Sequence, residues 1–138
     1  MKVKKCKNIN LNIKIYNKLY MTGKMTFRKK FTFEERLEQS KAIMEQYPER
    51  IPVICERFGQ DMPELDRHKF LVPKDLTFGN LLFVIRKRIK LEPEKAMYLF
   101  INSSLAPTSS TIMTLYNSHK EKDGFLYTTY AGESTFGN

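Results

Sequence analysis

One eight-residue stretch constrains the fold more than any other, and it reads RIPVICER at residues 50–57. Alternate residues of an extended chain face opposite sides. Ile51, Val53 and Cys55 therefore share one side, and Pro52, Ile54 and Glu56 share the other. The middle of the stretch is apolar on both sides, which predicts a strand covered on both faces of its sheet.

The segments around this strand predict a mixed sheet with helices. Thr32 and Glu35 have the spacing of a capping box, and Thr77 can cap a second helix. In chain order, we expect a short basic turn in TFRKKF, a helix from about Phe33 to Tyr47, strands at RIPVICER and KFLVP, the Thr77 helix, a strand at AMYLFIN, a short helix carrying Ile112, Leu115 and Tyr116, and a last strand from Phe125 to Tyr130. The order from Arg50 is β-β-α-β-α-β. It suits an α+β domain of β-grasp (ubiquitin) architecture, with a four-stranded sheet preceded by extra helical structure.

The net charge of +9 suggests a nucleic-acid or membrane-surface binder, but its distribution argues otherwise. Residues 1–24 contain seven lysines and no acidic residue, so the rest of the chain has a net charge of only +2. We therefore expect a domain over 25–131 preceded by a poorly ordered basic extension. Two alternatives are a basic arm that contacts anionic lipid or RNA, and an upstream segment that a start at Met25 omits.

Residues that carry chemistry are sparse. His68 and His119 lie in polar contexts without metal-ligand spacing, so we expect ordinary surface residues. Cys6 and Cys55 are too far apart to suggest a disulfide framework, and Cys55 falls in an expected buried strand, where a thiol is inert. No glycine-rich phosphate loop is present. The sequence therefore predicts no enzyme, no metal and no cofactor.

The C-terminal segment, 132–138, is small and polar without apolar periodicity. We expect it to extend into solvent as a flexible tail that ends in Phe136, Gly137 and Asn138. A glycine carbonyl is open to close approach by a nucleophile because no side chain shields it. The simpler alternative is a frayed terminus that happens to contain a glycine.

Several long blocks of the chain resemble one known family. In order along the chain, these blocks are RIPVICER, KFLVPKDLTFG, VIRKRIKLEPEKAMYLFIN and LAPTSSTIMTLYNSHKEKDGFLYTTYAGESTFG. They closely resemble the ubiquitin-like modifiers of autophagy, the family of microtubule-associated light chain three and GABARAP. The resemblance runs from about Met25 to the C-terminus. It implies a β-grasp core with two N-terminal helices.

The resemblance also implies a processing and conjugation pathway. A cysteine protease would cut between Gly137 and Asn138, and activating and conjugating enzymes would join the Gly137 carboxylate to phosphatidylethanolamine. The protein would then be found in the cytoplasm and, lipid-anchored, on autophagosome membranes, and in the vacuole or lysosome after fusion. Contact with the cytoskeleton is also expected, and binding to nucleic acid is not.

Members of the family bind cargo receptors and adaptors through short aromatic-x-x-aliphatic motifs, and KFLVP is a candidate edge strand for such peptides. The resemblance places the aromatic pocket at Ile43, Pro52, Ile54, Lys69, Leu71 and Phe125. It places the aliphatic pocket at Phe70, Val72, Pro73, Leu76, Leu81, Val84 and Ile85. Contacts to acidic residues beside the motif fall to Arg50, Arg67, Lys69 and Arg88.

Two positions depart from the family pattern and affect peptide preference. Gln39 stands where many relatives have a glutamate, and Leu81 stands where many have an aromatic residue. A competing hypothesis from another class is an unconjugated ubiquitin-fold module that binds cytoskeleton or RNA through its basic face and arm. The tail distinguishes the two hypotheses, because a simple binding module does not need Phe136 and Gly137 at an extended end.

Overall fold

The computed structural model describes residues 26–133 and shows four helices and five strands there. The elements are α2 (Phe27–Lys30), α3 (Phe33–Gln46), β1 (Arg50–Arg57), β2 (Lys69–Pro73), α4 (Phe78–Arg88), β3 (Met97–Ile101), β4 (Ser104–Leu105), α5 (Ile112–His119) and β5 (Leu126–Gly132). Apart from β4, this is the expected order of elements, and the α+β prediction is confirmed.

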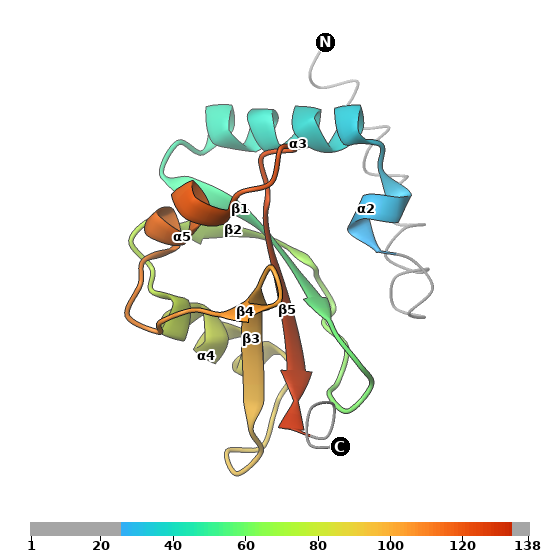
Figure 1. The fold of residues 1–138 in the computed structure, drawn as a ribbon, viewed down its shortest axis with the longest axis vertical. Helices are drawn as coiled ribbons and strands as arrows, with labels where there is room; N and C mark the ends of the chain where they lie inside the picture. The colour runs from blue at the N-terminus through green and yellow to red at the C-terminus, as the bar shows by residue number, and fades with distance from the viewer. Residues whose placement is uncertain (1–25, 134–138) are drawn as a thin grey trace.

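The strands form one sheet in the order β2-β1-β5-β3-β4 (Figure 1). The two central strands, β1 and β5, are parallel, with Val53 opposite Leu126. β2 pairs antiparallel to β1, and β3 pairs antiparallel to β5. The first and last strands of the chain therefore lie side by side, and β2 is an edge strand of the sheet in the part of the chain that the structure describes.

The helices begin where the sequence predicts. The Thr32 hydroxyl accepts a hydrogen bond from the Glu35 amide, and the Glu35 carboxylate accepts one from the Thr32 amide, which completes a capping box. Thr77 and Asn80 form the same reciprocal pair at the start of α4. α3 ends with Tyr47 as its C-cap, directly before Pro48, because proline cannot continue a helix.

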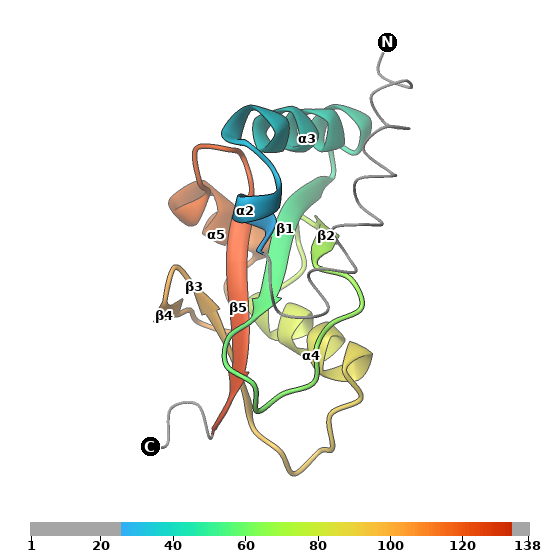
Figure 2. The ribbon, with the colours of Figure 1, turned by 90° about the vertical axis from the view of Figure 1, so that its right-hand side faces the viewer.

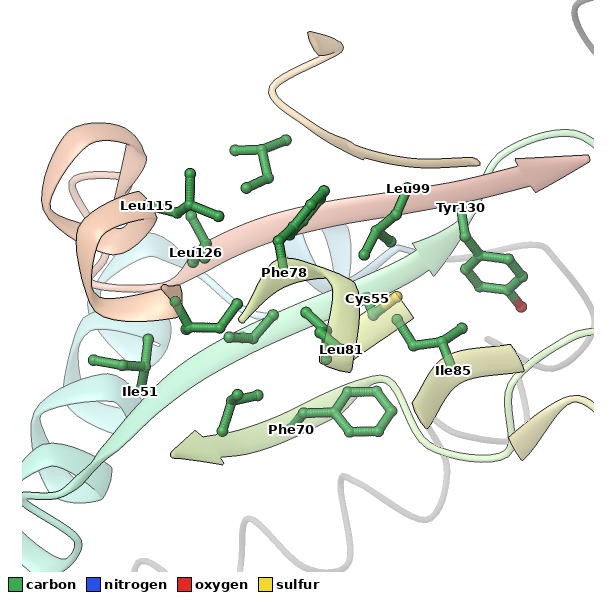
Figure 3. Close-up of a cluster of buried hydrophobic side chains, with 14 of the residues drawn as sticks. Ile51, Cys55, Phe70, Phe78, Leu81, Ile85, Leu99, Leu115, Leu126 and Tyr130 are labelled. Carbon is green, nitrogen blue, oxygen red and sulfur yellow. The ribbon is translucent and has the colours of Figure 1, made fainter. Parts of the chain in front are cut away.

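The two faces of the sheet are covered by different elements. Nineteen buried residues form a large apolar core on the face that carries α4 and α5 (Figure 3). α2 and α3 lie on the other face (Figure 2), where five buried residues form a smaller cluster. Its members are Phe27, Phe31, Ile54, Phe125 and Tyr127. β1 is buried on both sides over residues 51–55, as its sequence predicts.

Three details differ from expectation. The loop after β3 contains the two-residue strand β4, which pairs with Phe100 and Ile101, so the sheet has five strands instead of four. β5 continues to Gly132, two residues past its expected end, because Ala131 and Gly132 pair with Tyr98 and Met97. The small, polar composition after Tyr130 conceals this pairing, since it depends on backbone groups.

His68 is the third difference, because it is buried, with 3% of its surface exposed, instead of being an ordinary surface residue. Its carbonyl accepts a hydrogen bond from the Cys55 amide, which extends the β1–β2 ladder by one pair. Its Nε2 lies 3.2 Å from a carboxylate oxygen of Glu64. Burial lowers the pKa of the imidazole to about 4, so His68 is neutral at pH 7.

Candidate peptide-binding edge

The outer edge of β2, the side away from β1, has backbone groups arranged as in a strand that can accept another strand. The Cys55 amide bonds to the His68 carbonyl, so residues 68, 70 and 72 direct their peptide groups toward β1. By alternation, the N–H and C=O of Lys69 and Leu71 point toward the open edge. Such groups are the template for β-augmentation by an extended peptide.

Arg50 partly covers this edge. Its Nη1 donates a hydrogen bond of 3.0 Å to the Leu71 carbonyl, across the end of the strand pair. A peptide strand that bonds to the Leu71 carbonyl must displace this guanidinium. The displaced side chain is then available to an acidic residue of the peptide.

The six residues expected to form the aromatic pocket come from four segments of the chain and meet on the α3 side of the sheet. They are Ile43 from α3, Pro52 and Ile54 from β1, Lys69 and Leu71 from β2, and Phe125 before β5. Ile54 and Phe125 are fully buried, and the ring of Phe27 packs 5.1 Å from that of Phe125. These two residues can serve as the floor of a pocket, whereas Ile43, Lys69 and Leu71 are partly exposed and can form its walls.

Lys69 and Gln39 contact each other beside the expected aromatic pocket. The Lys69 ammonium donates a hydrogen bond of 3.2 Å to the side-chain oxygen of Gln39, which is buried, with 6% of its surface exposed. Among the residues that the structure describes, the amide nitrogen of Gln39 has no hydrogen-bond partner. Because the amide of Gln39 is neutral, Gln39 itself does not compensate the charge of Lys69.

The residues expected in the aliphatic pocket divide into two groups. Phe70, Val72, Leu81 and Ile85 are buried in the large core between β2 and α4 (Figure 3). Pro73 and Leu76 are partly exposed, and Val84 is exposed. The buried group holds β2 and α4 together, so the second group is what a ligand can reach first.

The four expected cationic contacts are spread along the edge of the domain. Arg88 lies 3.6 Å from a carboxylate oxygen of Asp66, and its guanidinium lies 5.6 Å from the centre of the Phe70 ring. Arg67 is exposed, and Arg50 and Lys69 make the contacts given above. Exposed ion pairs such as Arg88–Asp66 contribute little stability, so Arg88 can exchange partners readily.

A buried polar network, which the sequence does not reveal, joins α3 to the start of β5. Asp123 is 3% exposed and accepts hydrogen bonds from Arg36, from the Tyr127 hydroxyl and from the Phe125 amide. Ser40 donates to the Asp123 carbonyl. Arg36 also donates to two carbonyls around α2, those of residues 28 and 31. The only sequence signal was Asp123-Gly124, a turn dipeptide.

Cys55 is the cysteine within residues 26–133, and its thiol is fully buried. Burial raises the pKa of the Cys55 thiol to about 12, so it stays protonated and unreactive. Over residues 26–133 no group of His, Cys, Asp and Glu has the arrangement of a metal site. In the same range, no helix combines the length and apolarity needed to cross a membrane.

A hollow of about 880 Å³ lies elsewhere, at the C-terminal end of α4 and the loop that leads to β3. Arg86 fixes this loop by donating hydrogen bonds to the carbonyls of Glu92 and Lys95. None of the residues expected to bind the peptide line it. Gly137 and Asn138, the expected cleavage and conjugation residues, lie outside the described residues.

Comparison with known proteins identifies the family. The family described as "Autophagy protein Atg8 ubiquitin like" matches residues 35–137. Autophagy-related protein 8 of Saccharomyces cerevisiae is 51% identical over 83% of this chain and 98% of its own length. Autophagy-related protein 8a of Arabidopsis thaliana is 49% identical over 84% of this chain and 96% of its own length.

A solved structure agrees with these relatives. The crystal structure of Trypanosoma brucei ATG8 superposes with a TM-score of 0.75 at 42% identity, covering 79% of this chain and 95% of that one. The family match continues through residue 137 and therefore includes the glycine near the C-terminus. The chain belongs to the Atg8 family of ubiquitin-like modifiers of autophagy.

Proposed function

We propose that this chain is cut between Gly137 and Asn138 and is then joined through Gly137 to phosphatidylethanolamine on autophagosomal membranes. The observation that carries the proposal is the family match, which continues through residue 137 and so includes the tail glycine. A glycine carbonyl is unshielded, which suits attack by the successive cysteines of a protease and of activating and conjugating enzymes. The protein is the substrate of this pathway and not an enzyme.

The lipid gives the domain its attachment to a membrane. Stable anchoring generally needs two hydrophobic signals, and the two acyl chains of phosphatidylethanolamine supply both. The unconjugated protein is cytoplasmic and the conjugated protein is peripheral on the autophagosome. Residues 1–24 form a basic extension that the domain does not need for folding.

On the membrane, the β2 edge recruits cargo receptors and adaptors with aromatic-x-x-aliphatic motifs. The aromatic side chain enters between α3 and β2, above Ile54 and Phe125, and the aliphatic one enters between β2 and α4, near Leu76 and Val84. The peptide backbone bonds to the outward groups of Lys69 and Leu71. Arg50, Arg67 and Arg88 favour acidic residues beside the motif.

The conjugation proposal is tested by mass spectrometry of the C-terminal peptide from membrane fractions of starved cells. We expect a peptide that ends at Gly137 and carries the lipid. The matched variants are Gly137→Ala, expected to block processing or conjugation with the fold intact, and deletion of Asn138, expected to bypass the protease and still permit lipidation. Recovery of unmodified FGN ends alone in the membrane fraction contradicts the proposal and supports the unconjugated binding module.

The peptide edge is tested by Leu71→Ala. Leu71 is partly exposed and lies outside both buried clusters, so its truncation should leave the fold intact. We expect affinity for an aromatic-x-x-aliphatic peptide to fall about tenfold, the scale of a pocket anchor. Phe70→Ala, in contrast, removes a core residue and should lower stability as well. Unchanged affinity in a folded Leu71→Ala protein places the groove elsewhere.

A further inference from the structure

Gly132, the last residue of β5, is held by a loop that lies about 70 residues earlier in the chain. The Gly132 amide donates a hydrogen bond of 3.2 Å to a carboxylate oxygen of Asp61, in the loop between β1 and β2. A Cβ atom at position 132 would lie 2.5 Å from the Met62 methyl carbon and 2.7 Å from the second oxygen of Asp61. Gly132 is thus where the loop closes over the strand.

This loop is fixed to the strands on both sides of the closure. Arg57 donates a hydrogen bond of 2.7 Å to the Met62 carbonyl, and the Tyr130 hydroxyl donates one of 2.8 Å to the Pro63 carbonyl. The Phe58 amide donates to the Tyr130 carbonyl at 2.8 Å. Met62 itself is 6% exposed and belongs to the large core. Asp61 is therefore carried by a rigid segment.

We propose that Asp61 is a positioning residue for C-terminal processing: it fixes the point at which the chain leaves the sheet, so that a processing enzyme meets the tail in a defined place. The proposal rests on the proposed function. Five residues separate Gly132 from the Gly137 carbonyl, a reach of at most about 17 Å. Over so short a span, the position of Gly132 limits where the scissile bond can be.

Release of the Gly132 amide has a predictable kinetic signature. The last pair of the β5–β3 ladder, Gly132 with Met97, then frays, and more residues must be ordered when the tail enters an enzyme's cleft. This cost is the same for bound substrate and for the transition state. It raises KM and leaves kcat unchanged.

The test uses the full chain as substrate for the processing cysteine protease of this pathway and measures kcat and KM separately. We expect Asp61→Ala to raise KM about threefold to tenfold, the change that loss of one net hydrogen bond produces. Asp61→Asn keeps an acceptor oxygen, so its KM should stay close to that of the wild-type protein. The matched control is Asp66→Ala, which removes a carboxylate from the same loop. Because the ion pair of Asp66 with Arg88 is exposed, this variant should keep the wild-type KM.

Hydrogen exchange of the Gly132 amide gives the second readout, with faster exchange expected in Asp61→Ala and a melting temperature lowered by only a few degrees. The inference is overturned if Asp61→Ala is cut with the wild-type KM, or if kcat falls and Asp61→Asn gives no rescue. These results differ from failure of the proposed function, in which the wild-type chain itself is not cut after Gly137.

Discussion

The sheet is covered on its two faces by different kinds of interaction. On the face of α4 and α5, nineteen buried residues, nearly all apolar, form the core. On the face of α2 and α3, five buried residues are joined by the polar network around Asp123. The first face is held mainly by the burial of apolar surface, whereas the second combines a small aromatic cluster with a few directed hydrogen bonds.

The difference assigns separate tasks to the two faces. The apolar face holds the β-grasp core together and includes Phe70, Val72, Leu81 and Ile85, whose removal must weaken the whole domain. The polar face attaches the N-terminal helices and frames the proposed aromatic pocket. A face held by few contacts can open without unfolding the rest, because local stability follows local burial.

The largest expected effect tests the apolar face. Ile85 is fully buried between α4 and the sheet, so Ile85→Ala should lower the free energy of unfolding by about 2–5 kcal/mol. Because this core carries the domain, both faces should unfold in one transition in denaturant, followed by fluorescence and circular dichroism together. Separate transitions for the two probes contradict a common core.

Asp123→Ala tests the polar face. It leaves Arg36, the Tyr127 hydroxyl and the Phe125 amide without their shared acceptor, and we expect a loss of about 2–4 kcal/mol. Amide exchange should accelerate in α2 and α3 while α4 stays protected. Asp123→Asn, which keeps one of the two acceptor oxygens, should give a smaller loss. Uniform acceleration over both faces shows that they are a single cooperative unit.

Those two predictions also mark what the sequence could supply. Element order, helix starts and the two-sided burial of β1 follow from periodicity and from the caps at Thr32 and Thr77, which are local signals. The Asp123 network, the Asp61–Gly132 contact and the burial of His68 join residues far apart in the chain. A single sequence has no pattern for such contacts, so an aspartate in a turn and a histidine in a polar loop look like surface residues.

The expected site residues came from the family resemblance, and the residues themselves indicated only that KFLVP is a candidate edge strand. The hydrogen bond from Lys69 to Gln39 and the guanidinium of Arg50 on the Leu71 carbonyl depend on how α3 and β1 lie against β2. Only the assembled sheet shows that a ligand must compete with Arg50 for that carbonyl.

A third prediction concerns the polar exception on the apolar side, His68. Its pKa is about 4 in the folded protein and 6.5 in an unfolded chain, so between these values the unfolded state binds more protons. Stability should therefore fall as the pH drops from 6.5 to 4, by roughly 3 kcal/mol, and this group should have little effect above that window.

The groups around His68 modify the slope. Burial also raises the pKa of the Glu64 carboxyl. As the pH falls, the folded state therefore protonates Glu64 before the unfolded state does, and this group adds stability at the acid end, opposite to the effect of His68. Asp66 favours the charged imidazole and so limits the lowering of its pKa. Unfolding in urea at several pH values, compared with His68→Asn, checks the prediction. If the stability of the variant changes with pH as steeply as that of the wild-type protein, the pH dependence arises from other groups.

The smallest expected effect is at the boundary between the two faces, where Gln39 of the polar side meets Lys69 of the edge strand. Gln39→Glu places a carboxylate beside the Lys69 ammonium at nearly constant volume and so compensates the charge that an acidic peptide would meet. We expect a peptide with acidic residues beside its motif to bind about threefold to tenfold more weakly, with the loss shrinking at high salt. A matched peptide with neutral flanks should bind equally to both proteins, and Gln39→Leu, which adds no charge, should retain the acidic peptide.

Equal losses for both peptides in calorimetric titrations would mean that the glutamate acts through pocket shape, and no loss for either would mean that Lys69 does not face the ligand. In the expected case, one neutral side chain on the polar face sets the charge preference of an edge strand that the apolar face holds in place.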